Sequence, residues 1–190
     1  MTKQIYIIHG YRASSTNHWF PWLKKRLLPD GIHAEVLDMP DPHQPRLKDW
    51  LDTLSLNKHT LNKHTYLVAH SLGCAAVLRF LEQTQLRQPL GGILLVSGFA
   101  NSLPDLKMLD EFTEESFDFQ NIIQSAKHRA VIASRDDQIV PFAWSKDLAQ
   151  QIDAKLYEVQ HGGHFLETDG FTSLPIVYDV LNSYFSKETC

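Results

Sequence analysis

The chain has 190 residues, of which 43% are apolar and 21% charged, and its net charge is −4 with the histidines neutral. This composition is typical of a globular protein with one sizeable core, and we expect a single domain over residues 1–190. There is no run of Lys and Arg, so nucleic acid is not an expected partner. No stretch approaches the roughly 18 apolar residues of a membrane span, so we expect no membrane partner either.

Cysteine usage and the N-terminal segment bear on the cellular compartment. Cys74 and Cys190 do not have the spacing of a disulfide framework or a metal site. The apolar run in MTKQIYIIHG is too short for the core of a signal peptide, and no small-residue cleavage site follows it. We therefore expect a cytoplasmic location.

Short strand-like runs alternate with helical patterns along the chain. Runs rich in Ile, Val and Leu predict six strands, at residues 4–8, 34–37, 66–69, 92–96, 129–133 and 156–159. Apolar residues at helical spacing predict helices at residues 19–28, 45–56, 72–83, 142–151 and 173–185. Near-continuous apolar strands separated by helices are typical of a parallel sheet that is buried on both faces. The fold class is therefore α/β, and ligands are expected beyond the carboxyl ends of the strands.

The segment 99–127 departs from this alternation. It is acidic and also holds a series of large apolar residues, namely Leu103, Leu106, Met108, Leu109, Phe112, Phe117 and Phe119. Long insertions in such folds often carry function, so we expect a short helical cap whose apolar residues contact a substrate. The alternative is an elongated crossover helix packed on the sheet.

The stretch TYLVAHSLGCAAV places Ser71 directly between a predicted strand and a predicted helix, with almost no loop. Such a tight turn lifts a serine clear of its backbone and aims the first N–H groups of the helix at an approaching carbonyl oxygen. The turn requires small residues two positions before and after the serine, and these are Ala69 and Gly73. The pattern predicts a nucleophile elbow of the G-x-S-x-G type with Ala69 in the first glycine position. The alternative is that Ser71 only caps the helix.

A serine nucleophile needs a base and an orienting acid, which follow it in the order acid, then histidine. Two aspartates, Asp136 and Asp137, come directly after the fifth predicted strand. Two histidines, His161 and His164, follow the sixth strand and flank a pair of glycines that permit a sharp turn. The residue types, their order and their positions at strand ends together indicate a catalytic triad. Neither an H-E-x-x-H motif nor a cysteine cluster supports a metal site at the same residues, so no metal or other cofactor is expected.

Four motifs, HGY near the start, HSLG around Ser71, DDQIVP after the fifth strand and GGHF after the sixth, resemble a known family. It is the small serine-hydrolase family of α/β-hydrolases that includes YdeN-type bacterial proteins and retinoblastoma-binding protein 9. The resemblance covers essentially the whole chain and implies a six-stranded, pared-down hydrolase sheet with helices on both faces. It also implies Ser71, Asp137 and His164 as the triad, because the acid of the family precedes x-x-V-P and its histidine follows Gly-Gly and precedes an aromatic residue. Asp136 would then form hydrogen bonds within the turn.

An oxyanion hole needs two N–H donors near the nucleophile. The backbone N–H of Leu72, directly after Ser71, is the first candidate. The second should come from the loop after the first strand, where His9-Gly10-Tyr11 predicts the N–H of Tyr11.

These features predict a serine hydrolase that cleaves a small ester or related acyl compound through an acyl-enzyme. The rival hypothesis is a protein-interaction module on the same fold, with incidental esterase activity and a protein partner that the sequence does not identify. Dinucleotide binding is excluded because the loop after the first strand reads HGYRASS, with no G-x-G-x-x-G.

Overall fold

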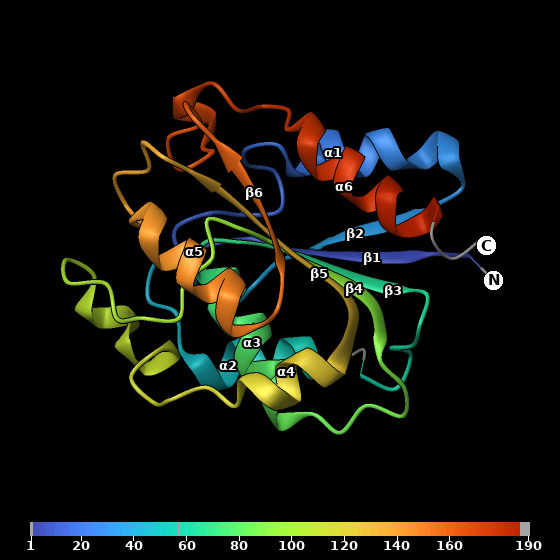
Figure 1. The fold of residues 1–190 in the computed structure, drawn as a ribbon, viewed down its shortest axis with the longest axis horizontal. Coiled ribbons are helices and arrows are strands. Elements are labelled where there is room, and N and C mark those ends of the chain that lie inside the picture. Colours follow the sequence, from blue (N-terminus) through green and yellow to red (C-terminus); the bar gives the residue numbers. More distant parts are fainter. Residues whose placement is uncertain (1, 57, 187–190) are drawn as a thin grey trace.

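The computed structural model describes residues 2–56 and 58–186, and Cys190 lies outside the described residues. Its centre is a six-stranded sheet in the order β2-β1-β3-β4-β5-β6 (Figure 1). Every neighbouring pair of strands is parallel. The strands are β1 (Gln4–Ile8), β2 (His33–Leu37), β3 (Thr65–His70), β4 (Leu90–Val96), β5 (Ala126–Ser134) and β6 (Lys155–Val159). The predicted α/β fold with a parallel sheet is confirmed.

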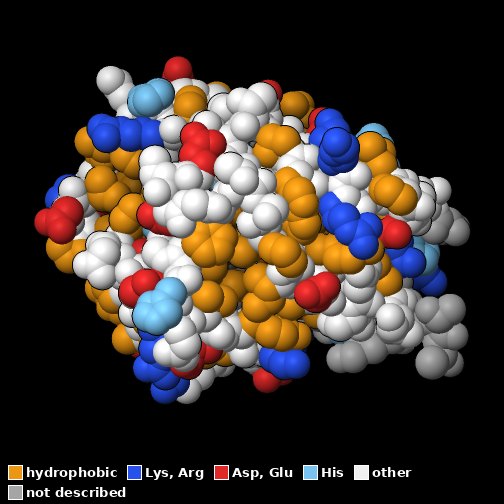
Figure 2. Space-filling view, turned by 90° about the horizontal axis from the view of Figure 1, so that it is seen from above, with side chains coloured by type: hydrophobic (Ala, Val, Ile, Leu, Met, Phe, Trp, Pro, Cys, Tyr) orange, Lys and Arg blue, Asp and Glu red, His pale blue; other side chains and the backbone are white. Residues whose placement is uncertain are grey.

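Helices cover both faces of the sheet, because the strands are apolar on both sides. One face carries α1 (Phe20–Leu27) and α6 (Pro175–Ser186), and the other carries α2 (Leu47–Ser55), α3 (Leu72–Gln83), α4 (Phe119–Ser125) and α5 (Phe142–Gln151), as Figure 1 shows. Each face has its own apolar cluster, which includes Trp19 and Phe20 on the α1/α6 side and Trp50 and Phe112 on the other. Figure 2 shows hydrophobic side chains between charged ones on the outer surface of the α1/α6 side.

The central strands are the most deeply buried part of the molecule. Every residue of β3 and β4 is buried, which agrees with their near-continuous apolar sequences. The strand β5 begins three residues before the predicted start at Arg129. There the backbone pairs with β4, for example Leu90 with Ala126 and Gly92 with His128, although Lys127 and His128 are polar. Because the strands are parallel, the carboxyl ends of β3, β5 and β6 lie at the same edge of the sheet, and the candidate residues lie at this edge.

The segment 99–127 contains two short helical elements rather than one long helix. A 3-10 helix, η2 (Lys107–Phe112), is followed by α4, which leads directly into β5. The buried side chain of Arg79 on α3 fixes the intervening chain, donating hydrogen bonds to the carbonyl oxygens of Phe112 (2.9 Å) and Glu115 and forming an ion pair with Glu82 (2.8 Å). The first half of the segment reaches the candidate site, and α4 packs on α3 as a crossover helix.

None of the helices described in residues 2–56 and 58–186 is long and apolar enough to cross a membrane. The cytoplasmic location stays a prediction.

Candidate active site

Ser71 stands at the sharp turn between β3 and α3. Its backbone has φ 53° and ψ −122°, a conformation that is rare and costly for a residue other than glycine. Two glycines make room for this turn. A Cβ on Gly73 would lie 2.6 Å from the carbonyl oxygens of Ile8 and His9, and a Cβ on Gly10 would lie 2.9 Å from the Cβ of Ser71. The β1 loop can therefore pass directly beside the serine, as the nucleophile-elbow pattern requires.

His164 lies on the turn that follows β6, where the chain makes a second strained bend. Gly163 has φ +51° and Phe165 has φ 57°. Both backbone polar groups of His164 are bound by side chains. Its N–H donates to Asp169 Oδ2 at 2.9 Å, and its carbonyl oxygen accepts from His70 Nε2 at 2.8 Å. The contact with Asp169 lies within this turn (the histidine turn, residues 160–170), and the contact with His70 holds the turn against the end of β3, directly before Ser71.

Asp137 lies on the turn after β5 and is 9% exposed. Its Oδ1 accepts hydrogen bonds from the backbone N–H groups of Ile139 and Val140, both at 2.9 Å. Its Oδ2 accepts one from the hydroxyl of Ser97 at 2.8 Å, at the end of β4. Hydrogen-bond donors thus fix the carboxylate from two directions, and one oxygen edge remains for the imidazole.

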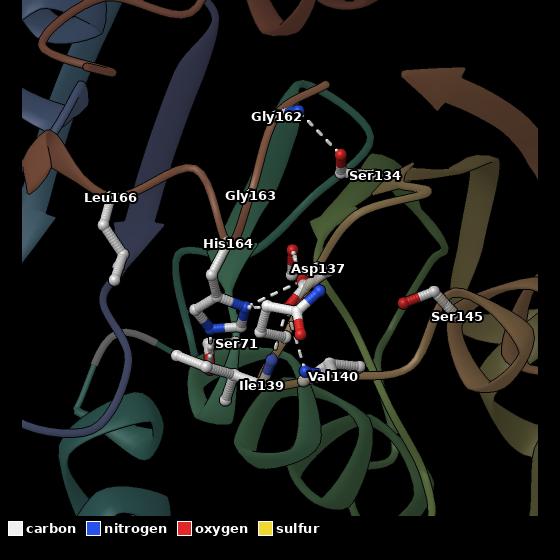
Figure 3. Close-up of polar contacts among 12 residues, drawn as sticks. Ser71, Ser134, Asp137, Ile139, Val140, Ser145, Gly162, Gly163, His164 and Leu166 are labelled. Carbon is white, nitrogen blue, oxygen red and sulfur yellow. Dashed lines mark hydrogen bonds and ion pairs between the residues drawn. The ribbon is translucent and has the colours of Figure 1, made fainter. Parts of the chain in front are cut away.

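The structure brings Ser71, His164 and Asp137 into one hydrogen-bonded chain (Figure 3). His164 Nε2 lies 2.8 Å from Ser71 Oγ, and His164 Nδ1 lies 2.8 Å and 3.0 Å from the two carboxylate oxygens of Asp137. An ionised carboxylate can only accept, so Nδ1 carries the proton of the neutral ring. Nε2 is then left as the acceptor for the serine hydroxyl proton, which is the arrangement needed for general-base activation of a nucleophile.

Asp136 points away from this chain and organises the neighbouring backbone. Its Oδ1 accepts from Ser134 Oγ (2.6 Å) and from the N–H groups of Gly162 (3.0 Å) and Gly163 (2.8 Å). These hydrogen bonds, that from Ser134 first, hold the pKa of Asp136 well below its ordinary range. His161 lies 3.4 Å from Asp136 with its side chain 90% exposed. Asp136 therefore ties the turn after β5 (the acid turn, residues 135–141) to the histidine turn, chiefly through the N–H groups of Gly162 and Gly163.

Two further histidines lie buried next to the site. Burial lowers the pKa of His9 and lowers that of His70 well below its usual value, so both are neutral near neutral pH. In His9 the Nε2 atom accepts from the N–H of Met39 at 3.0 Å, and in His70 the Nε2–H donates to His164. Neither ring contacts the serine hydroxyl through a hydrogen bond that the structure describes. Among residues 2–56 and 58–186, no three His, Cys, Asp or Glu side chains are grouped so that they could hold a metal ion.

The two candidate N–H donors lie on either side of Ser71. Leu72 is the first residue of α3, and the N–H at this position has no acceptor within its own helix. The N–H of Tyr11 has no acceptor among the hydrogen bonds of the described residues, and Tyr11 lines the cavity next to Ser71.

A cavity of about 460 Å³ opens in front of Ser71 and His164. Its apolar lining comes from four places, namely the loop after β1, the segment around η2, the acid turn and the histidine turn, with residues Ala13, Leu103, Pro104, Leu106, Leu109, Ile139 and Leu166. The prediction that Phe112 and Phe117 contact the substrate is wrong, because both are buried in the core on the α2/α3 side. Phe112 packs edge-on against Trp50 at 5.5 Å.

Sequence reasoning missed Ser97, Asp169 and His18. Ser97 binds the carboxylate of Asp137, Asp169 binds the backbone N–H of His164, and His18 lines the cavity. The hydrogen bond from His70 to the backbone of His164 agrees with its prediction as a hydrogen-bonded structural residue beside the site. Ser97 follows a strand, as Ser71 and Asp137 do, so its place at a strand end was the one signal available in the sequence. The contact of Asp169 depends on a turn five residues away, which no sequence pattern shows.

A serine nucleophile elbow with a histidine and an aspartate at the ends of later parallel strands defines the class of protein: an α/β-hydrolase. A family model for serine hydrolases matches residues 5–183, and the chain belongs to this family. Hydrolase function follows at the level of the family, and the resemblance seen in the sequence is confirmed.

Among known proteins, the chain is similar to YdeN of Bacillus subtilis, at 80% identity over 189 residues and 100% of both chains. The crystal structure of the B. subtilis ydeN gene product superimposes with a TM-score of 0.96 over 97% of this chain and 100% of that one. Serine hydrolase RBBP9 of Rattus norvegicus is 28% identical over 170 residues, 88% of each chain. Est1E of Butyrivibrio proteoclasticus, at 15% identity and a TM-score of 0.74 over 99% of this chain and 88% of that one, shares the fold.

Proposed function

We propose that the chain hydrolyses small esters through a triad of Ser71, His164 and Asp137. The observation that carries the proposal is the hydrogen-bonded chain from Ser71 Oγ through His164 to Asp137, with 2.8 Å at each link. The family comparison supports hydrolysis in general, and the geometry of the site supports this chemistry in particular.

The reaction begins when Ser71 Oγ attacks the ester carbonyl carbon and its proton passes to His164 Nε2. The positive charge on the imidazolium is stabilised by Asp137, whose remaining hydrogen bonds keep it oriented toward Nδ1. The proton then passes from His164 to the alcohol oxygen as the ester C–O bond breaks. Water attacks the acyl-enzyme with His164 again as the base, and the free acid and Ser71 are released.

The negative oxygen that develops in each step needs preorganised donors, and we assign the N–H groups of Tyr11 and Leu72 to it. Removal of one such donor from an oxyanion hole typically costs 10²–10³-fold in kcat. Gly10 lets the Tyr11 backbone approach, because any larger residue would collide with Ser71. Neither step needs a cofactor.

The lining of the cavity favours an uncharged, apolar acyl group. Leu103 and Leu109 are buried and form a wall beside Ser71, with the half-buried Leu106 between them. An acyl chain against this wall would gain about 25 cal/mol for each Å² of apolar surface removed from water, and a charged chain would lose its hydration there.

The test is a panel of p-nitrophenyl esters of increasing chain length with the wild type and Ser71→Ala. We expect turnover by the wild type and a loss of several orders of magnitude in kcat in the variant, with an unchanged circular dichroism spectrum. Equal turnover by both proteins would refute the assignment of Ser71. Lack of turnover with every ester would favour the interaction module.

A further inference from the structure

His18 is a half-buried residue beside the cavity, on the loop between β1 and α1. It has a positive φ of 55° and lines the cavity together with Ser71, His70 and His164. Its ring contacts the rings of His70 and Phe20 edge-on, at 5.7 Å and 5.4 Å between centroids. The ring centroids of His70 and His164 are 5.0 Å apart, so His70 contacts both His18 and His164.

The orientation of the His18 ring is fixed by Glu167 on the histidine turn. The N–H of His18 donates to Glu167 Oε2, and the N–H of Glu167 donates to His18 Nδ1, both at 3.1 Å. Asn17 Nδ2 donates to Glu167 Oε1 at 3.4 Å. Because Nδ1 accepts, the proton of the neutral ring is on Nε2. Burial lowers the pKa of His18, which keeps the ring neutral near neutral pH.

Nε2–H of His18 therefore remains as a hydrogen-bond donor, and within residues 2–56 and 58–186 no hydrogen bond engages it. Apart from Ser71, His70 and His164, the other polar side chains that line the cavity are Tyr11, whose hydroxyl donates to Met108 Sδ, and Arg12, Asp105 and Gln138, which are exposed to solvent. His18 is half-buried and its ring is already oriented. A ligand that accepts a hydrogen bond from Nε2–H therefore does not lose affinity to the entropy cost of ordering a flexible side chain.

The two walls of the cavity come from opposite faces of the sheet. Leu103 and Leu109 belong to the apolar cluster on the α2/α3 side, whereas Ala13, which also lines the cavity, belongs to the cluster on the α1/α6 side, as does Phe20, which contacts the ring of His18. Leu166, which Figure 3 shows next to His164, lies on the same turn as Glu167 and lines the cavity too. If the acyl chain packs on the leucine wall, the alcohol part of the ester leaves past His18.

We propose that His18 donates a hydrogen bond from Nε2 to an oxygen atom in the alcohol part of the substrate. The substrate class would then be esters of an apolar acid with an alcohol that carries a second oxygen, such as an ether or a hydroxyl group. This inference rests on the proposed ester hydrolysis and adds a preference that the triad alone does not give.

The test uses two esters of equal length, butyl butanoate and 2-methoxyethyl butanoate, which differ by one ether oxygen in the alcohol part. The ratio of kcat/KM for the ether ester to that for the alkyl ester is measured in the wild type and in His18→Phe. We expect the ratio to fall about three- to tenfold in the variant, the range for one neutral hydrogen bond. The intrinsic reactivity of the two esters cancels in this comparison. An unchanged ratio would overturn the proposal.

Two further variants separate hydrogen bonding from packing. Leu166→Ala removes an apolar side chain beside the site, so it should change both rates by the same factor. His18→Gln keeps an N–H donor of similar reach and should retain a higher ratio than His18→Phe. A ratio in His18→Gln as low as in His18→Phe, with both variants folded by circular dichroism, would count against the hydrogen bond.

A wild-type measurement needs no variant to fold. A second pair of esters, methyl hexanoate and methyl 4-methoxybutanoate, also differs by one ether oxygen, which here lies in the acyl part. Each kcat/KM is divided by the rate constant for hydroxide-catalysed hydrolysis of the same ester. The wild type should then prefer 2-methoxyethyl butanoate to butyl butanoate, and should not prefer methyl 4-methoxybutanoate to methyl hexanoate. The reverse preference would overturn the inference while leaving ester hydrolysis intact. If no ester is hydrolysed, the proposed function itself fails.

Discussion

Asp137→Asn is expected to lower kcat by about 10⁴-fold, the cost of a wrong histidine tautomer in a comparable triad. The hydrogen bonds explain why. Because Oδ1 of Asp137 accepts from the backbone N–H groups of Ile139 and Val140, the amide oxygen of the variant must occupy that position. The amide NH₂ then takes the place of Oδ2 and points at His164 Nδ1.

An NH₂ group can only donate, so it would force Nδ1 to be the acceptor and move the ring proton to Nε2. Nε2 lies 2.8 Å from Ser71 Oγ and could then no longer accept the serine proton. The fold should survive, because the two backbone donors keep their acceptor. The loss should therefore appear in kcat, and a thermal unfolding curve should show a folded protein.

Asp136→Asn is the matched control on the neighbouring residue. Its oxygen can still accept from Ser134, Gly162 and Gly163, and the residue makes no contact with the triad that the structure describes. We expect less than about a tenfold loss in kcat, since the histidine tautomer is unchanged. Steady-state kinetics with p-nitrophenyl butyrate compare the two variants. A larger loss in Asp136→Asn than in Asp137→Asn would refute this reasoning.

Three further perturbations test the surroundings of the proposed triad. Asp169→Ala should lower kcat more than Asp169→Asn, because the amide oxygen can still accept from the N–H of His164; equal losses would exclude this role. The folded state keeps the pKa of His70 below its ordinary 6.5, so the unfolded chain binds a proton there first as the pH falls. The free energy of unfolding, measured by urea denaturation, should therefore fall below pH 6.5, by up to about 1.4 kcal/mol per pH unit for this residue. His70→Gln should make this dependence of the free energy on pH less steep. Leu103→Ala should change the ranking of acyl chain lengths, whereas Phe112→Ala should cost about 3–5 kcal/mol of stability and leave the ranking unchanged.

The sequence was sufficient for the parts of the fold and site that depend on local patterns. The six strands follow from short apolar runs, and the turn at Ser71 follows from small residues on both sides of a serine between a strand and a helix. The GGHF and DQIVP motifs led to His164 and Asp137, which the structure brings together with Ser71.

The supporting contacts could not be predicted, because they join residues far apart in the chain. His70 and His164 are 94 residues apart, and Ser97 and Asp137 are 40 apart. Periodicity also cannot tell which apolar residues of the segment 99–127 face a cavity and which face the core. The side chain of Phe112 lies in the core because it packs on Trp50 and because Arg79 binds its backbone carbonyl.

Whether Ser71 is the nucleophile is tested by covalent labelling with a fluorophosphonate probe, followed by mass spectrometry of the labelled peptide. We predict that the folded wild type is labelled on Ser71, that Ser71→Ala is not labelled, and that His164→Ala is labelled far more slowly. Undiminished labelling of Ser71→Ala, or a modified peptide that does not contain Ser71, would contradict this assignment.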